Sequence, residues 1–294
     1  MQRFNHLKYV IKHFLLLSRL LGLPSAVKVS ATKVFSGKRG NGLACIQPLG
    51  FPNALWVRTK GSDLEIIFQI FLKRDYDLST FAPYQSHIFE TCNRICKEGN
   101  VPLIIDAGAN IGASTLWFAV NFPDCQVYAI EPDPGNFDTL KRNAESHARV
   151  RLFHAGLWDR PTSLAVTDEC DLSWGRRFEE KPGSTLGIPS ITIPELLAAN
   201  RRLRPVIIKI DIEGAEVNLM RSNNNWVDDV PLMIFEAHDN LWHWLGTWKG
   251  SSHAFFSTLV RQKREYLTRG ENVFAFLHPE RVEQQETRRL ASIQ

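Results

Sequence analysis

The chain has 294 residues, of which 44% are hydrophobic and 22% are charged, and its formal net charge is +4. This composition is typical of a folded globular protein and excludes wholesale disorder. The basic excess is small and falls well short of the footprint of a nucleic-acid-binding protein, so we expect no nucleic-acid partner. The five cysteines include no CxxC pair and no histidine at zinc spacing, which indicates reduced thiols and a cytoplasmic protein.

Residues 1–21 have the pattern of an amphipathic helix. Apolar side chains recur at helical spacing, and Lys8, Lys12 and Arg19 interrupt them, so no uncharged stretch reaches the roughly 18 residues of a membrane-spanning helix. A cleaved signal is not expected either, because the apolar run is short and no small-residue cleavage site follows it. The pattern favours a helix packed on the main domain, with peripheral membrane contact as the alternative.

Short β-like runs and two helical patterns follow this helix. The β-like runs, separated by turn residues, are residues 27–35, 42–47 and 54–59. The helical patterns cover residues 61–72, with Ser62 or Asp63 as N-cap, and residues 86–97. We therefore assign residues 1–98 to an amino-terminal extension of helices and short strands.

From residue 99 onward, apolar runs alternate with helical patterns. Strands are predicted at residues 102–106, 126–131, 150–154, 206–211, 232–236 and 273–277, and helices at 114–121, 137–146, 193–200, 213–221 and 254–262. This alternation predicts a parallel sheet, and runs that are apolar at nearly every position predict strands covered on both faces. We expect a three-layer, Rossmann-like α/β domain over residues 99–280, a long excursion near the site at 167–190, and a polar tail at 281–294.

The strongest motif is the glycine-rich loop Asp106-Ala-Gly108-Ala-Asn110-Ile-Gly112, which follows a predicted strand and opens a helix. Gly108 lets the backbone approach a ligand closely, and the helix amino terminus offers free N–H groups. Asp106 ends the strand, where a carboxylate can accept hydrogen bonds from the ammonium group of a methionine. The loop lacks the GxGxxG pattern of dinucleotide folds, which weighs against a nucleotide-dependent oxidoreductase.

A second acid, Glu131, ends the next predicted strand. A carboxylate at this place can accept hydrogen bonds from both ribose hydroxyls of an adenosine. Two strand-end acids in register, without the dinucleotide pattern, indicate S-adenosyl-L-methionine as the cofactor.

Three segments, LIIDAGANIGAST, YAIEPDPGNFDTLKRN and IIKIDIEGAE, resemble in order and spacing the FkbM family of S-adenosylmethionine-dependent methyltransferases, over about residues 103 to 277. The resemblance implies the class I methyltransferase fold, with a seven-stranded, mostly parallel sheet. It also implies O-methylation of a hydroxyl on a sugar, a glycan or a secondary metabolite. Carried over by motif, the implied cofactor contacts are Asp106, Gly108, Asn110 and Gly112 at the methionine end, Glu131 with Pro132 at the ribose, and Ala155 and Gly156 by the adenine.

Acidic and histidine side chains follow the two strands predicted at residues 206–211 and 232–236. Asp211 ends the first, near the expected methyl group of the cofactor, and Glu236 and His238 follow the second. An alcohol is a poor nucleophile, so a base that removes its proton speeds attack on the methyl carbon. We expect His238 to be that base, with Asp211 and Glu236 as catalytic partners. Helix capping and a surface loop are the alternatives for Asp211 and His238.

The remaining expectations concern metal, acceptor and activity. We expect no resident metal, a divalent cation held by Asp211 and Glu236 being the alternative. Trp242, Trp244 and Trp248 favour a lid with some contact to a small-molecule or glycan acceptor. A non-catalytic binding module is the competing class, and the intact acids argue against it.

Overall fold

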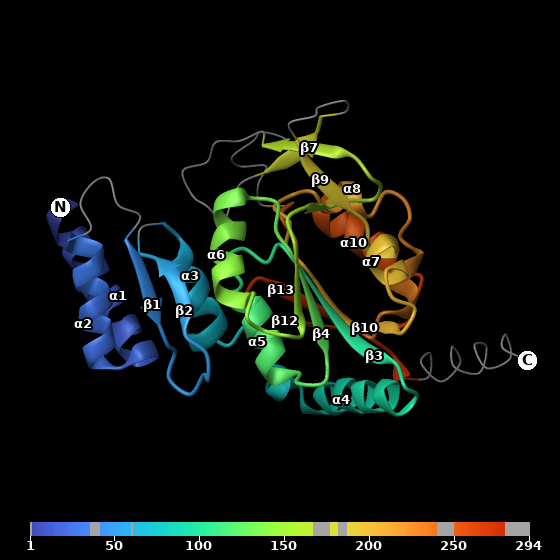
Figure 1. The fold of residues 1–294 in the computed structure, drawn as a ribbon, viewed down its shortest axis with the longest axis horizontal. Helices are drawn as coiled ribbons and strands as arrows, with labels where there is room; N and C mark the ends of the chain where they lie inside the picture. The colour runs from blue at the N-terminus through green and yellow to red at the C-terminus, as the bar shows by residue number, and fades with distance from the viewer. Residues whose placement is uncertain are drawn as a thin grey trace, which may run out of the picture.

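The structure, a computed structural model, describes residues 2–35, 42–59, 61–166, 177–181, 187–239 and 250–279. At its centre is a seven-stranded sheet with the order β12-β13-β11-β10-β3-β4-β5 (Figure 1). All neighbouring strands are parallel except β13, which is antiparallel to β11 and β12. The strands are β3 (Val101–Ala107), β4 (Gln126–Ile130), β5 (Val150–Phe153), β10 (Leu203–Ile210), β11 (Leu232–Glu236), β12 (Arg264–Arg269) and β13 (Asn272–Leu277). This topology confirms the expected class I methyltransferase fold.

Helices cover both faces of the sheet, because successive side chains of its strands point to opposite sides. Ile104 of β3 belongs to the apolar core on one face, whereas Leu103 and Ile105 belong to the core on the other. The first core includes side chains of α4 (Ala82–Lys97), α5 (Ala113–Asn121) and α6 (Pro134–Ala144), and the second includes side chains of α7 (Ile193–Ala198), α8 (Glu216–Leu219) and α10 (Ser251–Leu259). The expected three layers are therefore present.

The amino-terminal extension contributes buried side chains to the first core and lies on one side of the domain (Figure 1). It contains α1 (Gln2–Leu21), α2 (Leu23–Phe35), β1 (Leu43–Ile46), β2 (Leu55–Arg58), α3 (Asp63–Ile67), the π-helix η1 (Phe68–Leu72) and the 3-10 helix η2 (Leu78–Phe81). The strand predicted at residues 27–35 is wrong, because this segment is α2. Its valines favour a strand locally. Ala26 and Val29, however, are buried at helical spacing, and this tertiary packing stabilises the helix over the strand. No helix of the described residues is long and apolar enough to cross a membrane.

A second sheet lies beyond the carboxyl end of the central one (Figure 1). Its strands are β6 (Gly156–Leu157), β7 (Ser163–Val166), β8 (Phe178–Glu180) and β9 (Ile188–Ile191), in the order β6-β9-β7-β8. Parts of the predicted excursion at 167–190 are therefore β-structure. The helix predicted at 213–221 is also shorter, because Glu213 and Gly214 adopt positive φ angles of 54° and 94° before α8 begins. The 3-10 helix η3 (Asn225–Asp229) then leads to β11.

Candidate functional site

The glycine-rich loop joins β3 to α5 through a tight left-handed turn. Gly108, Asn110 and Gly112 have φ angles of 76°, 49° and 87°, a region that non-glycine residues rarely adopt. A Cβ atom at position 108 would collide with the carbonyl oxygen of Asp211, at the end of β10. The glycine therefore allows the loop to rest directly on the strand that carries the first catalytic candidate.

Asp106 is fully buried below this loop, and its carboxylate contacts other protein groups. Its Oδ2 accepts hydrogen bonds from the hydroxyls of Ser114 at 2.7 Å and Thr115 at 2.6 Å. Its Oδ1 lies 3.3 Å from the ammonium nitrogen of Lys209. These contacts hold the start of α5 against β3, and the expected contact with the methionine ammonium stays a prediction.

Glu131 lies buried at the end of β4, beside the same loop. Its Oε2 accepts a hydrogen bond from the backbone N–H of Asn110 at 2.8 Å, and its Oε1 accepts one from Asp133 at 2.9 Å. Burial raises the pKa of Glu131 to about 7, although these two N–H groups oppose the shift. The side-chain oxygen of Asn110 is buried and accepts no hydrogen bond within the part of the chain that the structure describes. This acceptor-rich corner fits the hydroxyl donors of a ribose.

The expected adenine contacts lie beside the second sheet. Ala155 and Gly156 are buried, and Glu131 donates its backbone N–H to the carbonyl of Phe153 shortly before them. A Cβ atom at Gly156 would lie 3.9 Å from the Cβ of Pro132 and would clash with Leu164 of β7. The structure thus brings Pro132 and Gly156 together at the edge of the cofactor region.

Lys209 is a central residue of the site, and no role is predicted for it from the sequence motifs. It is only 2% exposed, and its ammonium donates to the carbonyl of Gly108 at 2.7 Å and lies 3.5 Å from Oδ2 of Asp211. Burial would lower the pKa of Lys209, but Asp106 and other acidic groups raise it above its ordinary value, so the lysine stays charged. The available signal is a single lysine within the otherwise apolar run VIIKI.

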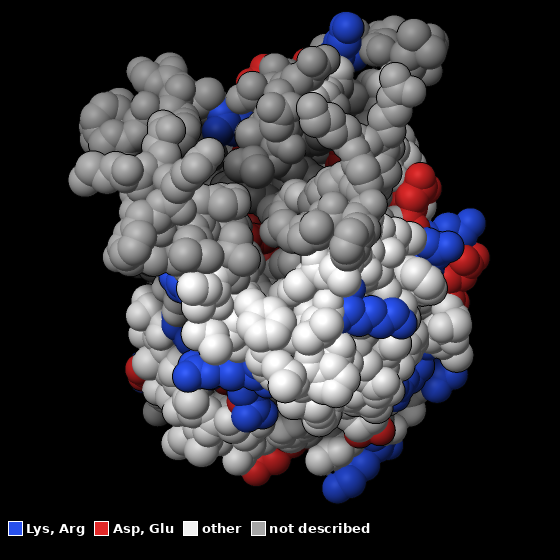
Figure 2. Space-filling model, turned by 90° about the vertical axis from the view of Figure 1, so that its left-hand side faces the viewer, with Lys and Arg blue, Asp and Glu red and all other residues white. Residues whose placement is uncertain are grey.

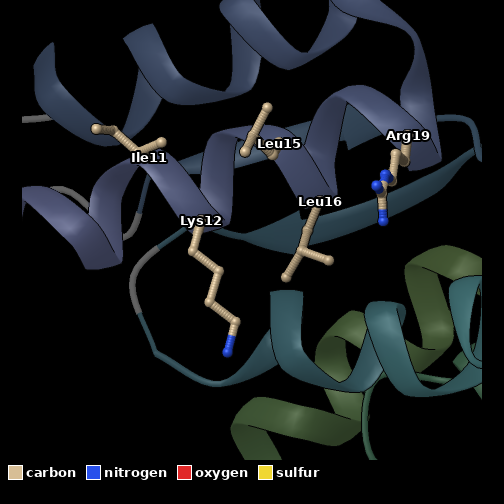
Figure 3. A pocket seen from close by; sticks show the side chains of 5 residues that line it. All are labelled: Ile11, Lys12, Leu15, Leu16 and Arg19. Carbon is tan, nitrogen blue, oxygen red and sulfur yellow. The ribbon is translucent and has the colours of Figure 1, made fainter.

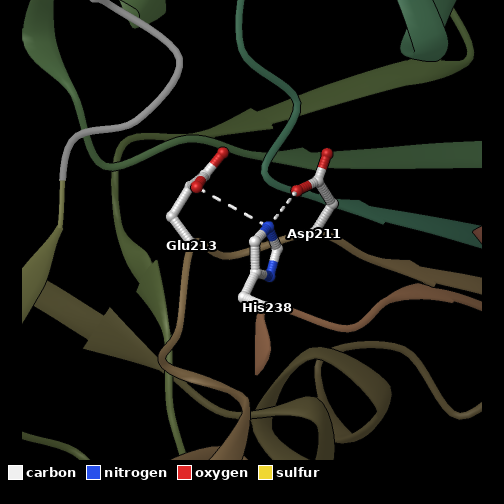
Figure 4. Close-up of side chains that lie close together, drawn as sticks. All are labelled: Asp211, Glu213 and His238. Carbon is white, nitrogen blue, oxygen red and sulfur yellow. Dashed lines mark ion pairs between the residues drawn. The ribbon is translucent and has the colours of Figure 1, made fainter. Parts of the chain in front are cut away.

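Four carboxylates lie around the ring of His238. Figure 4 shows two of them, those of Asp211 and Glu213, facing the same ring nitrogen. Its Nδ1 lies 2.8 Å from Oε1 of the buried Glu216. Its Nε2 lies 3.6 Å from an oxygen of Asp211, 3.6 Å from one of Glu213 and 3.8 Å from one of Glu236. We call these five residues the His238 cluster. The structure therefore brings the three catalytic candidates together, and it adds Glu213 and Glu216.

Burial and mutual charge shift every pKa that is resolved in this cluster. Burial would lower the pKa of His238, but its hydrogen bond to Glu216 and the carboxylates of Asp211 and Glu213 raise it to about 10. Burial and the charge of Asp211 raise the pKa of Glu213 to about 8 and that of Glu236 to about 7. These surroundings favour the imidazolium form, in which Nε2 carries a proton. His238 can therefore accept the proton of an acceptor hydroxyl only after it has first lost the proton on Nε2. Its expected role as the base stays a prediction.

The three tryptophans at positions 242, 244 and 248, and the polar tail at 281–294, lie outside the described residues. Their expected roles as a lid, an acceptor contact and a terminal tail therefore stay predictions.

Comparison with known proteins finds methyltransferases among the relatives of this chain. The chain is 26% identical over 204 residues to Methyltransferase 1 of Beauveria bassiana, which covers 59% of this chain and 75% of that protein. It is 26% identical over 134 residues to the hexuronic acid methyltransferase AglP of Haloferax volcanii, covering 45% of this chain and 54% of that relative.

Among solved structures, the chain is similar to a putative O-methyltransferase from Klebsiella pneumoniae, with 14% identity, a TM-score of 0.37, and coverage of 66% of this chain and 80% of that one. The family model of the methyltransferase FkbM domain matches residues 106–268, from the acid that precedes the glycine-rich loop to the edge strand β12. This match spans more than half of the chain and includes Glu131 and the whole His238 cluster. The protein therefore belongs to the FkbM family of methyltransferases.

Proposed function

We propose that this methyltransferase transfers the methyl group of S-adenosylmethionine to a hydroxyl oxygen on a sugar or glycan. The observation that carries the proposal is the placement of the His238 cluster. Asp211 and Glu236 end neighbouring parallel strands, and the backbone N–H of Asp211 donates to the carbonyl of Ala107 at 3.1 Å, directly before the glycine-rich loop. A proton-accepting cluster thus lies beside the loop expected to hold the cofactor.

The residues of the chain supply alignment and proton removal. The bound sulfonium cofactor supplies an electrophilic methyl group, whose carbon–sulfur bond breaks as the bond to the acceptor oxygen forms. Glu131 and Asn110 would bind the ribose, and the loop on β10 would hold the methyl end toward Asp211. The hydroxyl proton of the acceptor would pass to the His238 cluster, which leaves a methyl ether and S-adenosylhomocysteine.

The sugar class of acceptor is supported by the family resemblance and by one relative whose name specifies a hexuronic acid. The alternative of an oxidoreductase loses its support with the family assignment. A non-catalytic binding module is the remaining alternative, and it offers no reason for a buried imidazole to face three carboxylates.

Glu131→Ala tests the cofactor site. We expect the substitution to weaken S-adenosylmethionine binding by roughly 1–3 kcal/mol, because charge-assisted hydrogen bonds to the ribose are lost. Isothermal titration calorimetry measures the effect. Glu145→Ala is the matched control, since Glu145 is an exposed acid directly after α6.

A screen of uronic acids, neutral sugars and phenols, read out as release of S-adenosylhomocysteine, then tests the acceptor class. Turnover of phenols but not of sugars would contradict the sugar class and favour a phenolic acceptor.

For the cofactor site, an unchanged affinity of Glu131→Ala for S-adenosylmethionine would contradict the assignment of Glu131 to the ribose.

A further inference from the structure

We propose that Asp211, Glu213 and His238 bind a divalent cation, with Glu236 as a further ligand. The role of the ion in catalysis rests on the proposed function, whereas its binding does not. The ligand atoms of the first three residues lie within 4.8 Å of one another. The proposal departs from the expected metal-free site and extends the alternative of a cation held by Asp211 and Glu236.

The distances around Nε2 of His238 fit ligands of one ion better than hydrogen-bonded partners. The three carboxylate oxygens near Nε2 lie 3.6, 3.6 and 3.8 Å away, beyond the roughly 2.7–3.2 Å of a good hydrogen bond. Two ligands with bonds of about 2.1 Å to the same ion, at angles between square and tetrahedral, lie roughly 3.0–3.4 Å apart. Small side-chain shifts would therefore place all four groups around a cation.

Glu216 orients the imidazole as a ligand requires. This carboxylate is fully buried, accepts from Nδ1 of His238 at 2.8 Å and is held by the hydroxyl of Ser251 at 3.2 Å. With Nδ1 donating to Glu216, the other ring nitrogen points at Asp211 and Glu213 (Figure 4). Histidine ligands of metal ions are commonly held in this way by a carboxylate behind the ring.

The charge balance also calls for a cation. Within the part of the chain described, the only ion pairs that Glu213 and Glu236 form are with His238. Lys209 pairs with Asp106 and, among the acids of the His238 cluster, with Asp211 alone. An imidazole with carboxylates suits Mn²⁺, Fe²⁺, Co²⁺ or Zn²⁺ better than an all-oxygen site does. An acceptor hydroxyl bound to such an ion would lose its proton more readily.

Titration of the tag-free, chelator-treated protein with Mn²⁺, followed by the electron paramagnetic resonance signal of free Mn²⁺, tests the site. We expect one ion per chain in the wild type and loss of binding in His238→Ala and in Asp211→Asn. Glu216→Gln, which keeps every proposed ligand, should weaken binding by about 10–100-fold. The matched control is His253→Ala, because His253 is exposed on α10.

Absence of Mn²⁺ binding by the wild type, or equal binding in His238→Ala, would overturn the cation site. Calorimetry then measures S-adenosylmethionine binding by the same metal-free protein. This measurement distinguishes the loss of the cation site from a failure of the proposed function. A protein that binds the cofactor but no Mn²⁺ loses the cation site alone.

A different part of the molecule carries a second inference: we infer that α1 and α2 bind the surface of an anionic lipid bilayer. Residues 1–62 contain ten Lys and Arg and no Asp or Glu, whereas the other 232 residues contain 25 Lys and Arg and 31 Asp and Glu. The amino-terminal part thus carries a formal charge of +10 and the remainder −6. Negative lipid headgroups complement the first and are repelled by the second.

Apolar side chains are exposed on both helices. Ile11 and Leu15 of α1 are 51% and 56% exposed, and Leu23 and Val27 of α2 are 60% and 53% exposed. Each pair is four residues apart and therefore forms one row along its helix, away from the residues that the helix buries. We call them the apolar rows of the extension.

Basic side chains flank these apolar rows. Lys12, Arg19 and Lys28 are exposed, and Lys12 and Arg19 line a cleft on α1 together with Ile11 and Leu15 (Figure 3). On the left-hand side of the molecule, Lys and Arg border a broad uncharged surface (Figure 2). Apolar rows with basic flanks fit a bilayer surface, whereas the backbone of a nucleic acid would use only the charges.

Co-sedimentation with vesicles tests this surface. We expect the full chain to bind phosphatidylglycerol-containing vesicles at low salt, to bind them less at high salt, and to leave pure phosphatidylcholine vesicles largely unbound. The double variant Ile11→Ser/Leu15→Ser should reduce binding by at least about tenfold, because the apolar contact is lost. Val260→Ser is the matched control, since Val260 is 75% exposed after α10.

Equal sedimentation with and without anionic vesicles would overturn the lipid surface. So would unchanged binding in the double variant. Binding to duplex DNA together with no binding to vesicles would also overturn it, and would reassign the basic surface to nucleic acid.

Discussion

His238→Ala is expected to lower kcat by about 10²–10⁴-fold and to leave the Kd for S-adenosylmethionine nearly unchanged. The imidazole is 4% exposed and faces Asp211, Glu213 and Glu236, so its loss disrupts the cluster that we propose removes the acceptor proton, with or without a bound cation. The cofactor corner at Glu131 keeps its contacts, because none of them involves this ring. Steady-state kinetics and calorimetry measure the two quantities.

The control for this substitution is again His253→Ala, which should retain wild-type turnover. Because His238→Ala removes the partner of the buried Glu216, both proteins are compared below the onset of thermal unfolding. Asp211→Asn, at a half-buried position, gives a second measurement of the same cluster. Wild-type kcat in His238→Ala would remove the histidine from the mechanism.

Lys209→Met should lower the free energy of unfolding by about 3–5 kcal/mol, because it leaves the buried carboxylate of Asp106 without its cation. The ammonium lies 3.3 Å from Asp106 and donates to the backbone of the glycine-rich loop, so the loop loses a support as well. The expected shift in Tm is roughly 10 °C for a chain of this size. Differential scanning fluorimetry measures it.

Two further variants separate charge from packing in this result. Adding Asp106→Asn to Lys209→Met should restore part of the lost stability, because no unpaired charge remains at that position. Lys141→Met serves as the exposed control, since its ion pair with Glu145 lies on the surface at 3.8 Å and contributes less than about 1 kcal/mol. A decrease in the Tm of Lys209→Met as small as that of Lys141→Met would contradict the role of Lys209 in stabilising Asp106 and the glycine-rich loop.

The central strands are predictable from the sequence because local pattern and tertiary packing agree there. β3, β4, β10 and β11 are buried on both faces and therefore read as apolar runs. β12 is not predicted, because three of the six residues of this edge strand are charged and three are exposed, so it shows no apolar run. The small sheet beyond the carboxyl edge consists of strands of two to four residues, too short to show a period.

The acids of the candidate site are predictable because the carboxyl ends of parallel strands meet at one edge. This rule places Asp211, Glu236 and His238 together. It does not place Glu216, whose contact with the imidazole depends on the left-handed turn at Glu213 before α8. It also does not show that Lys209 would cross from β10 to the loop after β3, because such a contact depends on side-chain direction.

Gly108 has a consequence for how the two halves of the reaction are connected. Since its missing side chain lets the loop touch the carbonyl of Asp211, the segment expected to grip the methyl donor and the residue expected to meet the acceptor share one contact. We therefore expect that a movement of the loop on donor binding would shift the carbonyl of Asp211 directly, without an intervening side chain. An acceptor selected at the His238 cluster would in this way sense whether the donor is loaded, which favours an ordered sequence of binding.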